Sequence, residues 1–236
     1  MVHAAPLHQW AIEDCRLWGS QPCDQAQIAL VLLHGYGGWG RRCVESVPAG
    51  FRARAYMAVV APDGPHSAKL GDGYAWYPLS QNDEKNRRGA FVAASAVLAL
   101  LDALAMAFPA AAFVLAGFSQ GAAVALAAGL NDRAGRICSV VAHSGALVFA
   151  DGCAVPVNDK AIYHFVAGAD DRFVPPQMVA QCHEDLSGAG MRCSLSVLQG
   201  RAHRPSAPGW RIVRQAITAA QARPFGASAP AFERVG

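Results

Sequence analysis

The sequence predicts an α/β fold in which helices cover both faces of a mainly parallel central sheet. Short apolar runs of strand length alternate with segments of helix length, which is typical of parallel strands joined by crossover helices. The apolar runs are nearly continuous, as expected for strands that are buried on both faces. The chain of 236 residues is 53% hydrophobic and only 16% charged, which provides enough apolar side chains for such a core.

Each element is predicted from its own stretch of the chain. Apolar runs predict strands at residues 28–33, 56–61, 112–116, 137–142, 162–167 and 194–198. Helical patterning predicts helices at residues 88–108, 120–130, 176–189 and 206–222, the third of which opens with proline. The apolar stretch 90–107 includes Asp102, so we expect a buried helix there and not a membrane span.

Residues 1–223 are predicted to form a single domain, because α/β domains of this length often do not divide. Residues 62–87 are polar and rich in glycine and proline, so we expect a loop with a functional role. A surface insertion whose aromatic side chains pack into the core is the alternative. Residues 224–236 show no periodicity and are predicted to be a flexible tail.

Charge and cysteine content argue against several classes of protein. The net charge is +3 and no run of Lys or Arg exceeds two residues, so neither nucleic acid nor an integral membrane contact is expected. The seven cysteines include no C-x-x-C pair, which favours free thiols over zinc or redox sites. The N-terminus has no apolar signal-like segment, and we predict a cytoplasmic protein.

A serine lies between a predicted strand and a predicted helix in the pattern G-x-S-x-G. Residues 117–121 read Gly-Phe-Ser-Gln-Gly and directly follow an apolar run. A nucleophile elbow requires this context, because small flanking residues let the strand and the helix approach while the serine is held in a strained turn. We therefore predict Ser119 as a nucleophile, with an ordinary glycine-bounded turn as the alternative.

Partners for this serine are expected after later strands. His203 follows the last predicted strand, in the short turn where an α/β hydrolase requires its base. Asp170 and Asp171 both follow the strand before it, and the residues alone do not choose between them. The order serine, aspartate, histidine is that of the α/β hydrolases, so the sequence predicts the α/β-hydrolase fold.

Backbone amides suitable for an oxyanion hole are predicted at two places. The helix that begins at Gln120 directs unpaired N–H groups and its positive dipole end toward Ser119. Residues 34–38 read His-Gly-Tyr-Gly-Gly after an early strand, like the glycine loop that supplies the second amide in esterases. The N–H groups of Gln120 and Tyr36 are the predicted donors, although a merely flexible glycine loop is the alternative for the second.

Taken together, these segments resemble the phospholipase/carboxylesterase family, which includes acyl-protein thioesterases. The resemblance covers roughly residues 28–220 and rests on LHGYG at 33–37, GFSQG at 117–121, DRFVP at 171–175 and GRAH at 200–203. It implies that Asp171 is the acid, because the family's acid stands at a fixed distance before a Val-Pro pair. The chain departs from the family at Gly38, Ala167 and residues 201–202, and none of these departures removes a catalytic group.

The sequence thus predicts a serine hydrolase that cleaves carboxylic esters or thioesters of small or acyl substrates, with no metal or organic cofactor. Aromatic residues beside the motifs are predicted to line an apolar substrate pocket: Trp39, Trp76, Tyr77, Phe118 and Phe173. Acyl transfer, or lactone or peptide hydrolysis by the same triad, is the alternative, and a non-catalytic binding module is another. The choice between monomer and homodimer stays open.

Overall fold

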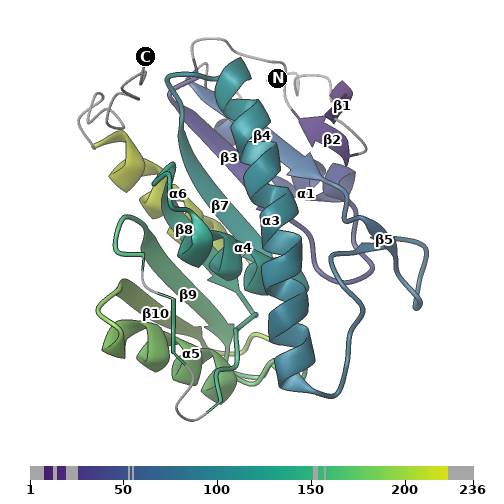
Figure 1. The fold of residues 1–236 in the computed structure, drawn as a ribbon, viewed down its shortest axis with the longest axis vertical. Helices are drawn as coiled ribbons and strands as arrows, with labels where there is room; N and C mark the ends of the chain where they lie inside the picture. The colour runs from purple at the N-terminus through teal and green to yellow at the C-terminus, as the bar shows by residue number, and fades with distance from the viewer. Residues whose placement is uncertain are drawn as a thin grey trace, which may run out of the picture.

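An eight-stranded sheet runs through the molecule in the order β1-β2-β4-β3-β7-β8-β9-β10 (Figure 1). The computed structural model describes residues 8–12, 15–19, 26–52, 54, 56–150, 154–156 and 158–222. From β4 to β10 along this order each strand is parallel to its neighbour, whereas β1, β2 and β4 pair antiparallel at one edge. The predicted mainly parallel sheet is confirmed, and the predicted tail at 224–236 lies outside the described residues.

The six predicted strands form the parallel part of the sheet. They are β3 (Ile28–Leu33), β4 (Met57–Pro62), β7 (Ala112–Phe118), β8 (Ile137–His143), β9 (Ile162–Gly168) and β10 (Arg192–Leu198). Four further strands were not predicted: β1 (His8–Ile12), β2 (Cys15–Gly19), β5 (His66–Ser67) and β6 (Tyr74–Ala75). The last two form a separate small sheet and are too short to show an alternating pattern.

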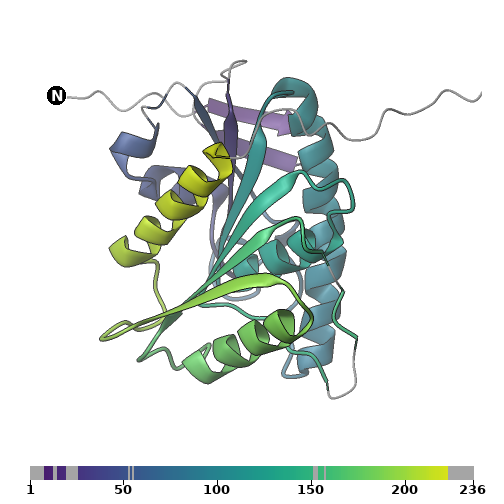
Figure 2. The same cartoon turned by 90° about the vertical axis from the view of Figure 1, so that its left-hand side faces the viewer.

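Helices cover both faces of the sheet, which Figure 2 shows nearly edge-on between α6 and α3. One face carries α3 (Asp83–Ala107), α4 (Gln120–Asn131) and α5 (Pro176–Gly188), and the other carries α1 (Gly40–Ser46), α2 (Ala49–Arg52) and α6 (Ala207–Gln221). Strand β3 divides its side chains between the two cores. Ala29, Val31 and Leu33 contact the first set of helices, and Ile28, Leu30 and Leu32 the second.

The loop prediction for residues 62–87 is wrong at its C-terminal end, because α3 begins at Asp83 and not at residue 88. The side chain of Asn82 accepts a hydrogen bond from the Lys85 N–H and thereby caps the helix. Asp83 and Glu84 add negative charge to the first turn, where the helix dipole favours it. These three residues form a helix-start signal that the apolar pattern alone does not include.

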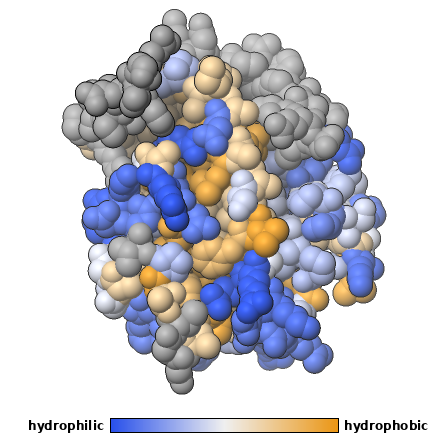
Figure 3. Space-filling model, in the orientation of Figure 1, coloured by the Kyte–Doolittle hydropathy of each residue, from blue (hydrophilic) through white to orange (hydrophobic). Residues whose placement is uncertain are grey.

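Helix α3 is the one helix in the described part of the chain that is long and apolar enough to cross a membrane. Its inward face is buried in the core through residues such as Ala94, Val97 and Leu101. The prediction of a buried helix therefore holds for this face. Its outward face exposes Val92 and Met106, and a band of hydrophobic surface is visible on this side of the molecule (Figure 3).

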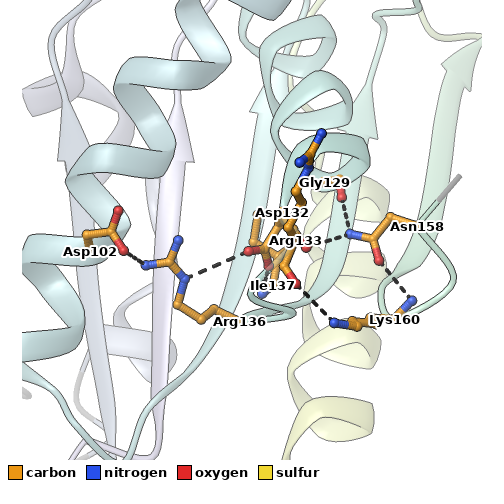
Figure 4. A network of polar contacts seen from close by, with 8 residues as sticks. All are labelled: Asp102, Gly129, Asp132, Arg133, Arg136, Ile137, Asn158 and Lys160. Atoms are coloured by element: carbon orange, nitrogen blue, oxygen red, sulfur yellow. Dashed lines mark hydrogen bonds and ion pairs between the residues drawn. The ribbon is translucent and has the colours of Figure 1, made fainter. Parts of the chain in front are cut away.

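A network of polar contacts closes the end of α4 that lies away from Ser119 (Figure 4). The Asn158 amide donates to the carbonyl oxygens of Gly129, at 2.6 Å, and Asp132, at 3.0 Å. The Asp132 carboxylate is buried and lies 3.8 Å from Arg136 Nε, and Arg136 in turn contacts Asp102 of α3. Asn158, in the chain before β9, thus satisfies carbonyls at the end of α4, and Arg136 links this end to α3.

Replacing Asn158 with alanine is expected to lower the free energy of unfolding by about 2 kcal/mol, because two buried carbonyl groups lose their donor. Urea denaturation followed by circular dichroism measures this change. Asn131→Ala, at an exposed position at the end of α4, is the control and should change the free energy of unfolding by less than about 0.5 kcal/mol. Equal effects of the two substitutions would contradict the role given to Asn158.

Candidate active site

The segment from Gly117 to Gly121 forms a tight turn between β7 and α4. Ser119 stands in this turn with φ 52° and ψ −117°, a backbone conformation that residues with a side chain rarely adopt. Both glycines are sterically required. A Cβ on Gly117 would lie 2.2 Å from the Gly121 carbonyl oxygen, and a Cβ on Gly121 would lie 2.3 Å from that of Leu33.

The structure brings Ser119, His203 and Asp171 together at the carboxyl edge of the sheet. His203 Nε2 lies 3.0 Å from Ser119 Oγ, and His203 Nδ1 lies 2.8 Å from Asp171 Oδ2. The three residues follow β7, β10 and β9, whose carboxyl ends converge because the strands are parallel. Since a carboxylate only accepts hydrogen bonds, His203 donates from Nδ1 and leaves Nε2 free to accept the Ser119 hydroxyl proton.

The carboxylate of Asp171 is buried and kept ionised by its hydrogen bonds. Its Oδ1 accepts from the backbone N–H groups of Phe173, at 3.0 Å, and Val174, at 2.9 Å. Burial on its own would raise the pKa of Asp171, but the Val174 amide and the His203 ring are the main groups that outweigh burial and lower the pKa below its ordinary value. Asp170, the alternative acid, is exposed, and its backbone N–H donates to the Arg201 carbonyl.

Tyr36 and Gln120, whose amides are the predicted oxyanion donors, both line the cavity that contains Ser119. In the described part of the chain, neither backbone N–H has a hydrogen-bond acceptor. The loop before Tyr36 is held by His34, whose Nε2 accepts from the Gly64 N–H at 2.9 Å, so that Nδ1 donates to the Gly35 carbonyl at 2.8 Å. Burial lowers the pKa of His34, and the ring is therefore neutral and structural.

The side chain of Gln120 links the turn at Ser119 to the neighbouring loop, which is a role that the sequence reasoning missed. Its Oε1 accepts from the Trp76 N–H at 2.9 Å, and its Nε2 donates to the Tyr77 carbonyl at 2.7 Å. The Trp76 indole N–H donates to the His34 carbonyl at 2.8 Å. The one available signal is that Gln120 is a polar residue at the start of an otherwise apolar helix.

Of the five aromatic residues predicted to line a substrate pocket, Tyr77, Phe118 and Phe173 line a cavity of about 530 Å³ beside Ser119. Trp39 and Trp76 are not among the residues that line it, which corrects their predicted placement. Trp76 is buried and stacks on the His34 ring, and Trp39 packs edge-on against Tyr74. Proximity to a motif in the sequence does not tell on which side of the backbone a side chain projects.

His143, at the end of β8, is a second histidine close to the site. Its ring packs edge-on against Phe118, with ring centroids 5.6 Å apart. Burial, and to a smaller extent the neighbouring His203, lower the pKa of His143 to about 4. The unfolded chain, in contrast, takes up this proton near pH 6.5.

This difference predicts a pH-dependent stability. Between pH 6.5 and 4 the unfolded state binds more protons at His143 than the folded state, so this histidine lowers the free energy of unfolding by about 3 kcal/mol as the pH falls across that range. Burial also lowers the pKa values of His34 and His164, which act in the same direction. His143→Gln should therefore make the slope in urea titrations shallower without removing it. The matched control His66→Gln, at an exposed position, should keep it. An unchanged slope in His143→Gln would show that folding does not lower the pKa of His143.

The comparison with sequence families decides the family. The profile described as phospholipase/carboxylesterase matches residues 20–220. The chain belongs to this family. As a phospholipase/carboxylesterase family member it is a hydrolase, and both the resemblance found in the motifs and the α/β-hydrolase fold are confirmed. No curated protein sequence matches the chain.

Solved structures agree with the family. Esterase PE8 is 26% identical, with a TM-score of 0.75 over 84% of this chain and 96% of its own. A phospholipase/carboxylesterase from Dyadobacter fermentans DSM 18053 is 25% identical, with a TM-score of 0.65 over 86% and 95% of the two chains. Acyl-protein thioesterase 2 from Zea mays, at 19% identity and a TM-score of 0.68 over 87% and 98%, shares the fold.

Proposed function

We propose that this family member hydrolyses carboxylic esters, and thioesters of similar shape, through an acyl-enzyme on Ser119. The observation that carries the proposal is the pair of contacts that joins Ser119 Oγ to His203 Nε2 at 3.0 Å and His203 Nδ1 to Asp171 Oδ2 at 2.8 Å. Membership of the family and the likeness to a structure described as an esterase support the reaction class.

The acylation half of the reaction uses the contacts in this order. Ser119 Oγ attacks the ester carbonyl carbon while its proton passes to His203 Nε2. Asp171 holds the ring so that Nε2 is the accepting nitrogen, and its negative charge stabilises the imidazolium that forms. When the tetrahedral intermediate collapses, the C–O bond to the alcohol breaks and His203 returns the proton to the departing oxygen.

Deacylation repeats these steps with water as the nucleophile. His203 takes one proton from the water as its oxygen attacks the acyl carbon, and then returns that proton to Ser119 Oγ as the carboxylic acid leaves. In both halves the negative oxygen is placed to accept from the N–H groups of Tyr36 and Gln120. Each such donor typically contributes a factor of about 10² to 10³ to kcat.

The proposal is tested by labelling with a fluorophosphonate probe. We expect one adduct per chain, located on Ser119 by mass spectrometry, together with turnover of a p-nitrophenyl ester series from acetate to dodecanoate. A parallel series of acyl thioesters then ranks esters against thioesters, and added alcohols reveal any acyl transfer. Turnover with the adduct on another serine would refute the role of Ser119, and the absence of both adduct and turnover would favour a binding module.

A further inference from the structure

A cation borders the cavity that contains Ser119. Arg87, on α3, lines this cavity together with Ser119 and His203. Its Nε is buried and has no hydrogen-bond partner, and no hydrogen bond or ion pair joins its terminal Nη atoms to any described residue. Because the Nη atoms are not among the buried unpaired atoms, they remain accessible.

The surroundings of Arg87 hold the guanidinium without neutralising it. Its Cζ lies over the Phe149 ring at 5.6 Å from the centroid, a contact that orients a guanidinium and leaves its edges free to donate. The neighbouring Arg88 differs, because it pairs with Glu84 at 2.5 Å on the exposed side of the helix. Asp83 also borders the cavity but is exposed to solvent and makes no ion pair with Arg87.

A partly buried guanidinium without an anion is a costly arrangement, because a buried donor that lacks a partner forfeits its hydration. The group that best satisfies it is a carboxylate, whose two oxygens accept from the two Nη atoms at once. The cavity that Arg87 and Ser119 both border is also lined by apolar side chains such as Leu147, Val148 and Met178. A short hydrocarbon segment of a substrate fits that lining.

We propose that Arg87 binds a carboxylate carried by the substrate, so that the enzyme selects anionic esters over neutral esters of the same length. This inference rests on the proposed function, since it names the substrate class of the Ser119 site. The carboxylate belongs either to the acyl part or to the alcohol part of the ester. Both arrangements use the same contact with Arg87, and the substrates tested below distinguish them.

The test compares matched pairs of esters. Monomethyl adipate against methyl hexanoate probes an anion on the acyl part, and the butyrate ester of 4-hydroxybenzoate against that of methyl 4-hydroxybenzoate probes an anion on the alcohol part. For each pair we measure the ratio of kcat/KM, anionic over neutral. In Arg87→Met this ratio should fall about 10-fold or more for one pair, as expected when a charged hydrogen-bonded contact is lost. Comparing ratios between variants cancels the intrinsic reactivity of the esters.

Two variants control for the substitution itself. Arg88→Met removes the same charge from the adjacent position and should leave both ratios within about 2-fold of wild type, because Arg88 is exposed and does not line the cavity. Arg87→Lys keeps the charge without the planar fork and should recover part of the preference. If both ratios are the same in Arg87→Met and wild type, or fall equally in Arg88→Met, the inference is overturned.

A binding measurement separates this inference from the proposed catalysis. Calorimetric titration of Ser119→Ala protein with each of the two anionic esters needs no turnover, and we expect the additional Arg87→Met substitution to weaken the binding of one of them about 10-fold. Binding of both anionic esters that is equal in the two proteins, or absent from both, would overturn the role of Arg87. Failure of the anionic and the neutral esters alike to turn over, with binding of an anionic ester still dependent on Arg87, would instead count against the proposed function alone.

Discussion

Ser119→Ala is expected to lower kcat for ester hydrolysis by about 10⁶-fold, since removing the nucleophile of a serine–histidine pair typically has an effect of this size. Without Oγ no acyl-enzyme can form, and only the oxyanion amides and substrate binding remain to assist attack by water. The measurement is single-turnover and steady-state hydrolysis of p-nitrophenyl butyrate by wild type and variant. The fluorophosphonate adduct should disappear in the same variant.

Folding must be intact for this result to be interpreted. Thermal melting of Ser119→Ala should stay close to that of wild type, because alanine replaces one hydroxyl in an unchanged turn. Ser95→Ala, on the exposed side of α3, is the matched control and should retain full activity. An Ser119→Ala protein that keeps more than about 1% of the wild-type kcat would contradict the assignment of the nucleophile.

Asp171→Asn should have the second largest effect, a loss of about 10⁴-fold in kcat. The amide oxygen can replace Oδ1 as acceptor for the Phe173 and Val174 N–H groups, which leaves an NH₂ group opposite His203. That group donates to Nδ1, so the proton of the ring moves to Nε2 and His203 can no longer accept from Ser119. Steady-state kinetics at neutral pH with the same ester measures the loss.

The neighbouring aspartate provides a direct control for this assignment. Asp170→Asn changes an exposed side chain and keeps the backbone N–H that donates to the Arg201 carbonyl. Activity should therefore stay within about 2-fold of wild type. A large loss in Asp170→Asn with little change in Asp171→Asn would reverse the choice of acid. The two variants together decide between the neighbouring candidates.

Much of the fold could be predicted because each buried strand is encoded locally. Strand β3 spans Ile28–Leu33, the predicted range, since all six of its residues are buried and apolar. Residues of β1 and β2 gave no such run, and their pairing with β4 depends on contacts across the sheet edge. Helix α3 was placed too late because capping by Asn82 is a polar signal that an apolar pattern does not contain.

The candidate site could be predicted where chain order and strand ends determine position. Ser119, Asp171 and His203 follow the carboxyl ends of the parallel strands β7, β9 and β10, so the topology of the sheet alone brings them near one another. The cavity lining could not be predicted in the same way. Whether Trp76 or Tyr77 borders the cavity depends on the path of one loop, and Arg87 was assigned to that loop, whereas it lies on the helix that follows.

The way Gln120 holds residues 76 and 77 bears on how the substrate preference of this enzyme could change in evolution or in the laboratory. Gln120 contacts only the main chain of these two residues, so the side chain of Tyr77, which borders the cavity, can change without removing either hydrogen bond that fixes the route of the loop. New specificities are therefore accessible by point substitutions such as those at position 77. Wholesale replacement of the loop, in contrast, would have to reproduce one N–H and one carbonyl group in register with Gln120.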